Sequence, residues 1–207
     1  MTALTVVQGI DISQWQGASF PWPQWKGKIG FGLVKATEGD GFTDPDFGRN
    51  WGSMWALQPD HRFPRFAYSF FHPSQDPIVQ AAHLVATVKG HGLYPGDNFV
   101  LDLEVNDGLP PAIVARRAAA FCHEVNSLAP GHRVLVYTSP SFAEAGNCAG
   151  LNAWRLWLAD YGVPAPTAPA PWDRATLWQY TDSPVDGDRF MGTEDELLAF
   201  TRMPDKR

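Results

Sequence analysis

Two carboxylic acids stand two positions apart in an apolar run, Asp102 and Glu104 in the segment FVLDLEV. In an extended strand, residues i and i+2 point to the same side, and two rises of about 3.3–3.4 Å separate their Cβ atoms by roughly 6.5–7 Å. Charge repulsion and lost solvation raise the pKa of one member of such a pair. A carboxylic acid that stays protonated near neutral pH can protonate a leaving oxygen, as glycoside hydrolysis requires. The alternative is a strand end whose carboxylates simply face water.

The elements that would position these acids alternate along the chain as strand, loop and helix. Near-continuous apolar runs predict strands at residues 5–12, 31–36, 65–71, 98–104, 133–138, 155–159 and 175–180. Helices are expected at 44–57, 76–91 and 110–128, and the second opens with Asp76 as a cap and Pro77 in its first turn. The last third leaves little room for helices, and its proline-rich stretch 163–171 is expected to be a loop. This α/β rhythm fits a parallel barrel with incomplete helical cover better than a doubly wound sheet.

Polar side chains recur where these strands end, and in a parallel α/β barrel the chemistry gathers at the carboxyl-terminal ends of the strands. Asp186 lies in the final loop, and the other candidates are found in or just after the predicted strands: Asp11, Lys35, Glu38, Tyr68, Asp102, Glu104, Tyr137, Asp160 and Gln179. Asp11 and Asp186 would join the first pair on one rim of the barrel. Four acids gathered there would cost electrostatic energy, so the cluster indicates a functional site.

A divalent metal ion is the alternative use of four carboxylates. No histidine lies at ligand spacing from these acids, and the sequence has no DxDxDG-type loop. A Ser/His/Asp hydrolase is poorly supported because no Gly-x-Ser-x-Gly motif is present, and the six histidines are interpreted as surface or loop residues. We therefore expect neither a metal nor a cofactor.

Length and charge narrow the class of protein further. A chain of 207 residues fits one domain or at most two small ones, and we expect a single catalytic domain over residues 1–207. Sixteen basic against twenty-two acidic residues, a net charge of −6, argue against nucleic acid as a partner. No apolar run reaches the roughly 18–20 residues that span a bilayer, and residues 1–10 lack a signal-peptide pattern. We expect a protein made in the cytoplasm, acting as a monomer and without a membrane partner.

Two residue types add less to the functional argument. Cys122 and Cys148 are too few for a disulfide framework and too far apart for a CxxC metal clip, so two buried thiols are expected, with one disulfide as the alternative. The chain has nine tryptophans, whose flat faces cover sugar rings well. Because most tryptophans are core residues, their number favours a carbohydrate ligand only modestly.

Eight segments, in this order and spanning nearly the whole chain, give the sequence a family resemblance. It resembles glycoside hydrolase family 25, the Chalaropsis-type lysozymes that include many phage endolysins. Each segment alone is weakly specific, whereas the ordered set is quite specific. The segments are GIDISQWQG (9–17), LVKATEGDGFTDPDF (33–47), FAYSFFHP (66–73), VLDLEV (100–105), VLVYTS (134–139), LWLADYG (156–162), LWQYTD (177–182) and VDGDRF (185–190).

The resemblance implies a modified TIM-like barrel of eight strands with fewer helices, and cleavage of the β-1,4 bond between N-acetylmuramic acid and N-acetylglucosamine in peptidoglycan glycan strands. Glu104 takes the family's general-acid position and Asp102 that of its partner carboxylate, while Asp11 and Asp186 match the two remaining acidic positions. Further motif residues would line the groove: Lys35, Tyr68, Tyr137, Asp160, Trp178 and Gln179. One motif departs from the family, because Ser69 stands where the third strand usually has histidine. That difference puts local groove contacts in doubt but leaves the chemistry untouched.

The resemblance also suggests a retaining mechanism, in which the substrate's own N-acetyl group attacks the anomeric carbon and Asp102 stabilises an oxazolinium-like intermediate. The spacing of the two carboxyls alone fits either a retaining or an inverting enzyme. The expected setting is that of a phage endolysin, made in the host cytoplasm and brought to the wall by a holin or by lysis. Two alternatives remain: a chitinase-like glycosidase, disfavoured because Val100 replaces an aspartate of its motif, and a non-catalytic glycan-binding barrel.

Overall fold

Eight strands close into a barrel in the structure, a computed structural model that describes residues 5–57 and 62–202. Seven of the strands run parallel around the ring, and the eighth, β9, is antiparallel to both of its neighbours, β8 and β1. The short strand β3 (Phe42–Thr43) forms a hairpin with the end of β2. In ring order the strands are β1 (Val7–Ile12), β2 (Phe31–Glu38), β4 (Arg65–Phe70), β5 (Asn98–Asp102), β6 (Val134–Thr138), β7 (Arg155–Ala159), β8 (Leu177–Thr181) and β9 (Asp186–Phe190).

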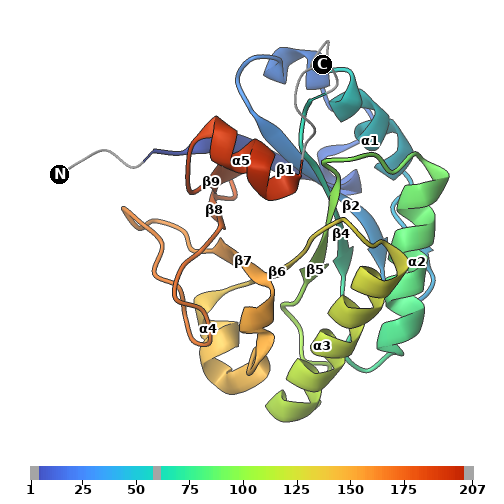
Figure 1. Ribbon diagram of the computed structural model, residues 1–207, viewed down its shortest axis with the longest axis vertical. Coiled ribbons are helices and arrows are strands. Elements are labelled where there is room, and N and C mark those ends of the chain that lie inside the picture. The colour runs from blue at the N-terminus through green and yellow to red at the C-terminus, as the bar shows by residue number, and fades with distance from the viewer. Residues whose placement is uncertain (1–4, 58–61, 203–207) are drawn as a thin grey trace.

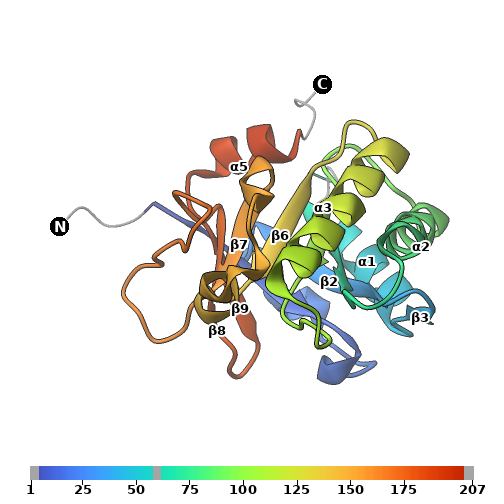
Figure 2. The ribbon, with the colours of Figure 1, turned by 90° about the horizontal axis from the view of Figure 1, so that it is seen from below.

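Helices cover only part of this barrel (Figures 1 and 2). The helices α1 (Phe47–Trp55), α2 (Pro77–Gly90) and α3 (Pro111–Leu128) lie together against one side, whereas β7, β8 and β9 are flanked mainly by loops and short helices. Asp76 caps α2 by accepting a hydrogen bond from the Ile78 N–H at 2.8 Å, as its sequence predicts. The remaining helices are η1 (Gln14–Gln16), η2 (Trp22–Trp25), α4 (Pro140–Phe142), η3 (Ala143–Asn147), η4 (Leu151–Ala153) and α5 (Glu194–Thr201).

Two apolar cores follow from the period-two alternation of the strands. Side chains facing inward fill the barrel, among them Phe31, Leu33, Phe66, Val100, Leu135, Trp157, Leu177 and Phe190. Their neighbours in sequence face outward and pack under the helices. Gly9 faces inward on β1, and a Cβ atom there would lie 2.4 Å from the ring of Phe31. The crowded interior therefore leaves no room for a side chain at position 9, and the middle of the barrel is a packed core.

The predicted fold class is confirmed: a barrel of eight strands with incomplete helical cover. The prediction that Asp186 lies in a loop is wrong, because it is the first residue of β9. The segment DGDRF has low strand propensity, and it becomes a strand because β8 and β1 each offer an unpaired edge. Helix α5 was also not expected; Thr193 and Glu196 form a capping box at its start.

The structure also shows the state of the two cysteines and the lengths of the helices. Cys122 and Cys148 are buried free thiols, the first of the two alternatives considered for them. None of the helices described is long and apolar enough to cross a membrane.

Candidate active site

A cleft of about 200 Å³ opens where the parallel strands end. Its walls come from several barrel strands and from the segment around η1. Seven of the ten site residues predicted from the sequence line it: Asp11, Tyr68, Asp102, Glu104, Tyr137, Gln179 and Asp186. The other lining residues are Ser13, Trp15, Gln16, Trp157 and Tyr161. The carboxyl-terminal rim of the barrel is thus the place where the predicted residues meet.

Asp102 and Glu104 lie on this cleft in very different surroundings. Asp102 is the last residue of β5 and is only 6% exposed, whereas Glu104 lies beyond the end of the strand and is exposed. The Leu103 N–H still donates to the Tyr137 carbonyl at 3.0 Å, which continues the pairing between these segments past the end of β5. Both carboxyls therefore line the cleft, with Asp102 at its floor and Glu104 at its open side.

Both members of the pair hold protons more tightly than ordinary carboxyls. Burial raises the pKa of Asp102 well above its usual range, the charge of Glu104 raises it further, and Lys35 opposes the shift. Although the Glu104 side chain reaches solvent, the cleft removes part of the water around its carboxyl, which also raises its pKa, again opposed by Lys35. Oδ1 of Asp102 is buried without a hydrogen-bond partner among the described residues, which leaves an acceptor at the cleft floor. The pair can thus keep a proton at a pH where an isolated carboxyl would be ionised.

Gln179 ties Asp11 to two tyrosines on the opposite wall. Its Nε2 donates to Oδ2 of Asp11 at 2.6 Å, while its Oε1 accepts from the Tyr137 hydroxyl at 2.9 Å and from the Tyr161 hydroxyl. Burial raises the pKa of Asp11 to about 7, and the charge of Asp186 adds to the increase. This chain of hydrogen bonds fixes the orientation of the amide, so Asp11 is held in place from across the cleft.

Strand β9 brings two acids to the same site. Burial, followed by the charge of Asp182, raises the pKa of Asp186 to about 6. Asp188 points to the same side two residues later and is fully buried, and its Oδ1 accepts from Trp157 Nε1 at 2.8 Å. Its carboxyl contacts that of Asp11, and burial followed by the charge of Asp11 raises the pKa of Asp188 well above its usual range. The charge of Asp11 therefore favours the protonated form of the neighbouring Asp188.

Sequence reasoning missed Asp188, although the signal was present. The segment VDGDRF repeats the spacing of LDLEV, with two acids at i and i+2. Assigning this segment to a loop hid the relationship, which is meaningful only in a strand. Trp157 and Tyr161 were missed as well, the first because it sits inside an apolar strand and looked like a core residue.

Lys35 lies beside the cleft without lining it. It is buried, and its Nζ forms an ion pair with Oε2 of Glu38 at 2.6 Å. Glu38 in turn contacts His72 at 3.4 Å, which contacts Asp107 at 3.2 Å. The positive charge of Lys35 thus partly offsets the rise in the pKa of Asp102 and of Glu104. The ion pair with Glu38 keeps Lys35 oriented.

Asp160 and Trp178 do not line the cleft. Trp178 lies on the outer face of β8, since Gln179 next to it faces inward, and its Nε1 donates to the Asp160 main-chain carbonyl at 2.7 Å. The Asp160 carboxylate accepts from the Thr167 N–H at 3.5 Å. In this structure both residues join the end of β7 to β8 and to the proline-rich loop. Their predicted role in substrate binding stays a prediction.

The acids are not arranged as a metal site. Over residues 5–57 and 62–202, no three His, Cys, Asp or Glu side chains are placed so that they could hold a metal ion together. The expectation of a metal-free enzyme stays a prediction that a chelator can test.

A parallel-stranded barrel with a paired buried and exposed carboxyl, and further acids and aromatic residues in one open cleft, defines a barrel glycosidase. Comparison with known families gives the same class. The model of the glycosyl hydrolases family 25 matches residues 10–188. The chain belongs to this family and is a glycoside hydrolase.

Relatives and solved structures agree with this assignment. Lysozyme M1 of Streptomyces globisporus is 31% identical over 93% of this chain and 70% of its own length. The N,O-diacetylmuramidase of Chalaropsis sp. is 30% identical over 86% of this chain and 89% of its own. The crystal structure of the bacterial lysozyme from Streptomyces coelicolor superposes with a TM-score of 0.84 at 28% identity, covering 98% and 99% of the two chains.

Proposed function

We propose that this chain is an N-acetylmuramidase that hydrolyses the β-1,4 bond between N-acetylmuramic acid and N-acetylglucosamine in bacterial peptidoglycan. The observation that carries the proposal is the juxtaposition of exposed Glu104 with buried Asp102 in the cleft of a family 25 barrel. Relatives named as a lysozyme and an N,O-diacetylmuramidase support this substrate.

In the proposed reaction, Glu104 is the general acid. Its carboxyl gives a proton to the glycosidic oxygen while the bond from that oxygen to the anomeric carbon breaks. The substrate's acetamido oxygen attacks the same carbon, and the positive charge that forms there favours the ionised form of Asp102, whose negative charge stabilises the resulting oxazolinium ion. Oδ1 of Asp102, which has no hydrogen-bond partner in the part of the chain that the structure describes, accepts the acetamido N–H. Water then opens the ring as Glu104 takes back a proton, so the configuration is retained.

The cleft continues into a second hollow that suits an extended glycan. This hollow has a volume of about 460 Å³ and shares Trp15 and Gln16 with the catalytic cleft. Trp15 is 81% exposed, unusual for such a large apolar side chain, and stands between the two hollows. Its ring offers a flat face on which a sugar next to the cleaved bond can stack.

The proposed setting is the bacterial cell wall, reached from the cytoplasm of a phage host through a holin or at lysis. The protein would act there as a monomer on glycan strands, with neither nucleic acid nor a membrane as its partner. The formal net charge of −6 supports the absence of a nucleic-acid partner.

Sugar analysis of a digest tests the proposed bond. Purified peptidoglycan is incubated with the protein, reduced with borohydride, hydrolysed and analysed, with Glu104→Gln as the matched control. New muramicitol, without new free amino groups, is the expected result. New glucosaminitol would assign the other glycosidic bond, and new stem-peptide amines would replace the glycosidase by an amidase or peptidase. No new product from the wild type would favour a glycan-binding barrel.

A further inference from the structure

Three arginines converge at the opposite end of the barrel, where the parallel strands begin. Arg133 directly precedes β6, Arg155 is the first residue of β7, and Arg202 follows α5. They line a hollow of about 360 Å³, and no Asp or Glu occurs among its described lining residues. Those residues are Asn126, His132, Arg133, Val134, Asn152, Ala153, Trp154, Arg155 and Arg202. We call this hollow the arginine pocket.

Contacts with the main chain and with α5 fix two of the guanidinium groups. Arg133 Nε donates to the Phe200 carbonyl, and its guanidinium lies over the Phe200 ring, 4.8 Å from the centroid. Arg202 Nη1 donates to the Gly131 carbonyl at 2.8 Å. Each contact uses one of the five N–H groups of its guanidinium, so most donors stay available. Within residues 5–57 and 62–202, none of the three arginines forms an ion pair with a carboxylate.

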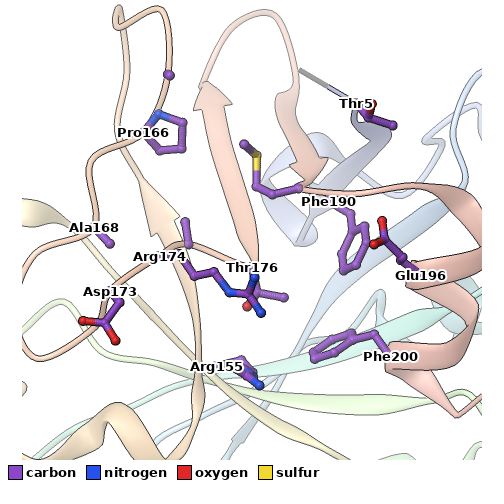
Figure 3. A pocket seen from close by; sticks show the side chains of 13 residues that line it. Thr5, Arg155, Pro166, Ala168, Asp173, Arg174, Thr176, Phe190, Glu196 and Phe200 are labelled. Carbon is purple, nitrogen blue, oxygen red and sulfur yellow. The ribbon is translucent and has the colours of Figure 1, made fainter. Parts of the chain in front are cut away.

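A larger hollow beside the arginine pocket differs from it in containing acidic as well as basic residues (Figure 3). It has a volume of about 530 Å³ and shares Arg155 with the pocket. There, Arg155 and Arg174 line the wall together with Asp173 and Glu196, so charges of both signs are present. Among the described residues that line the arginine pocket no carboxylate balances the positive charges, and the charges of Arg202 and Arg155 add to burial in lowering the pKa of Arg133. This unbalanced cluster stands out in a chain whose net charge is −6.

We propose that the arginine pocket binds a phosphate group of an anionic phosphodiester polymer attached to the bacterial wall. A guanidinium matches the oxygens of a phosphate through parallel N–H bonds, and three of them approach from three different elements. The choice of a wall polymer rests on the proposed function, which brings the protein to the wall. Because the pocket and the catalytic cleft lie at opposite ends of the barrel, both can be occupied at once.

The lining disfavours two other phosphate-bearing partners. Single-stranded nucleic acid is held by aromatic side chains on which bases stack, and Trp154, the large aromatic residue of this lining, is only 7% exposed. The arginines surround a hollow, whereas an anionic membrane surface is contacted by cations spread over an exposed face. A flexible polymer can place one phosphate at a time into such a hollow.

Calorimetric titration of the full chain with synthetic poly(glycerol phosphate) tests this proposal. The variant Arg155→Gln/Arg202→Gln is expected to bind at least about tenfold more weakly, because it lacks the charged hydrogen-bond donors of two of the three guanidinium groups. Arg116→Gln/Lys26→Gln makes the same change in charge at two exposed residues outside the pocket and is expected to bind within about twofold of wild type. The Tm of each variant shows that it is folded.

Further arms of the titration identify the source of the phosphate. A single-stranded oligonucleotide and vesicles of anionic phospholipid are expected to bind more weakly than the polymer, with little dependence on Arg155 and Arg202. Tighter, arginine-dependent binding of either would overturn the assignment to a wall polymer. Equal polymer binding by the pocket variant and the control variant would overturn the pocket itself.

Hydrolysis of phosphate-free peptidoglycan separates this proposal from the proposed function. The Arg155→Gln/Arg202→Gln variant is expected to keep the wild-type kcat on that substrate, and Glu104→Gln is expected to keep polymer binding. Wild-type hydrolysis without polymer binding would refute only the arginine pocket. Polymer binding without release of muramic reducing ends would refute only the muramidase.

Discussion

The catalytic cleft and the arginine pocket lie at opposite ends of the barrel, and each gathers charges of one sign, but the two sites differ in how their groups hold protons. At the carboxyl-terminal rim, burial and repulsion raise the pKa of each of these acids: Asp11, Asp102, Glu104, Asp186 and Asp188. At the other end, Arg133, Arg155 and Arg202 keep their charges, because a guanidinium does not lose its proton near neutral pH. Acids that lie close together thus keep a proton that can be donated in catalysis. Arginines that lie close together stay positively charged and can bind an anion.

Among substitutions of the acids in the catalytic cleft, the largest expected effect is a loss of turnover. Asp102→Asn is predicted to lower kcat by about 10²–10³-fold with little change in KM, because its negative charge acts on the transition state more than on the bound ground state. Asp11→Asn and Asp186→Asn should cost less, since these acids position the sugar or the first pair. Kinetics of the three variants on one soluble glycan, across pH, check the ranking. If Asp102→Asn changed only KM while Asp186→Asn stopped turnover, the roles of the two residues would be exchanged.

A second test uses pH, to which only the acidic end responds near neutrality. The pKa of Asp11 is about 7 in the folded protein and near 3.8 when unfolded, so the folded state binds the extra proton between these values. The free energy of unfolding is therefore expected to fall as pH rises from about 4 to about 7, by at most about 4 kcal/mol from this group. Denaturant unfolding at several pH values measures it, with Asp11→Asn as the control that should make the dependence on pH less steep. A stability that rose through this window would contradict the protonated cluster.

Asp188 allows the structural role of a buried acid at this end of the barrel to be tested separately from catalysis, because the substrate need not touch it. Asp188→Asn should keep the bond from Trp157 Nε1 and supply an N–H toward Asp11, so its stability is expected near that of the wild type. Asp188→Leu leaves the Trp157 N–H unpaired and should lower the free energy of unfolding by about 1–3 kcal/mol. Equal stability of the two variants would show that the carboxyl pair does not hold this part of the barrel.

The smallest expected effect is none at all. Activity should survive EDTA, because the carboxyls act as acid, stabiliser and positioning groups without an ion. The rate of wall lysis in EDTA, against an untreated sample, measures this. Loss of activity in EDTA, with recovery on adding a divalent metal, would show instead that the acids of the catalytic cleft bind a metal ion.

The sequence predicts the barrel and most of its site for one physical reason. A near-continuous apolar run that ends in a polar residue, such as the run that ends at Asp102, predicts a buried strand. It also predicts that the polar residue lies at the carboxyl-terminal rim of the barrel. The strand β9 could not be recognised this way, since Asp186, Gly187 and Asp188 disfavour a strand until β1 and β8 pair with it. Helix α5 was missed although its capping box, Thr193 with Glu196, is visible in the sequence.

The arginine pocket shows what sequence patterns cannot supply. Its three arginines are separated by 22 and 47 positions and belong to different elements, so no local spacing links them. The inward or outward direction of Trp178 likewise depends on the register of β8, which a shift of one residue would reverse. Contacts between distant segments require the folded barrel.

The central step of the proposed reaction is the delivery of a proton by Glu104 to the glycosidic oxygen. The most direct measurement compares Glu104→Gln and wild type on two substrates: a wall glycan, and a wall disaccharide joined to dinitrophenolate, which leaves without a proton. On the glycan, the variant is predicted to be slower by about 10²–10⁴-fold, since the amide cannot supply the proton. On the activated substrate it should form the intermediate at close to the wild-type rate. Equal losses on both substrates, or lysis of walls at the wild-type rate, would contradict the assignment of Glu104 as the acid.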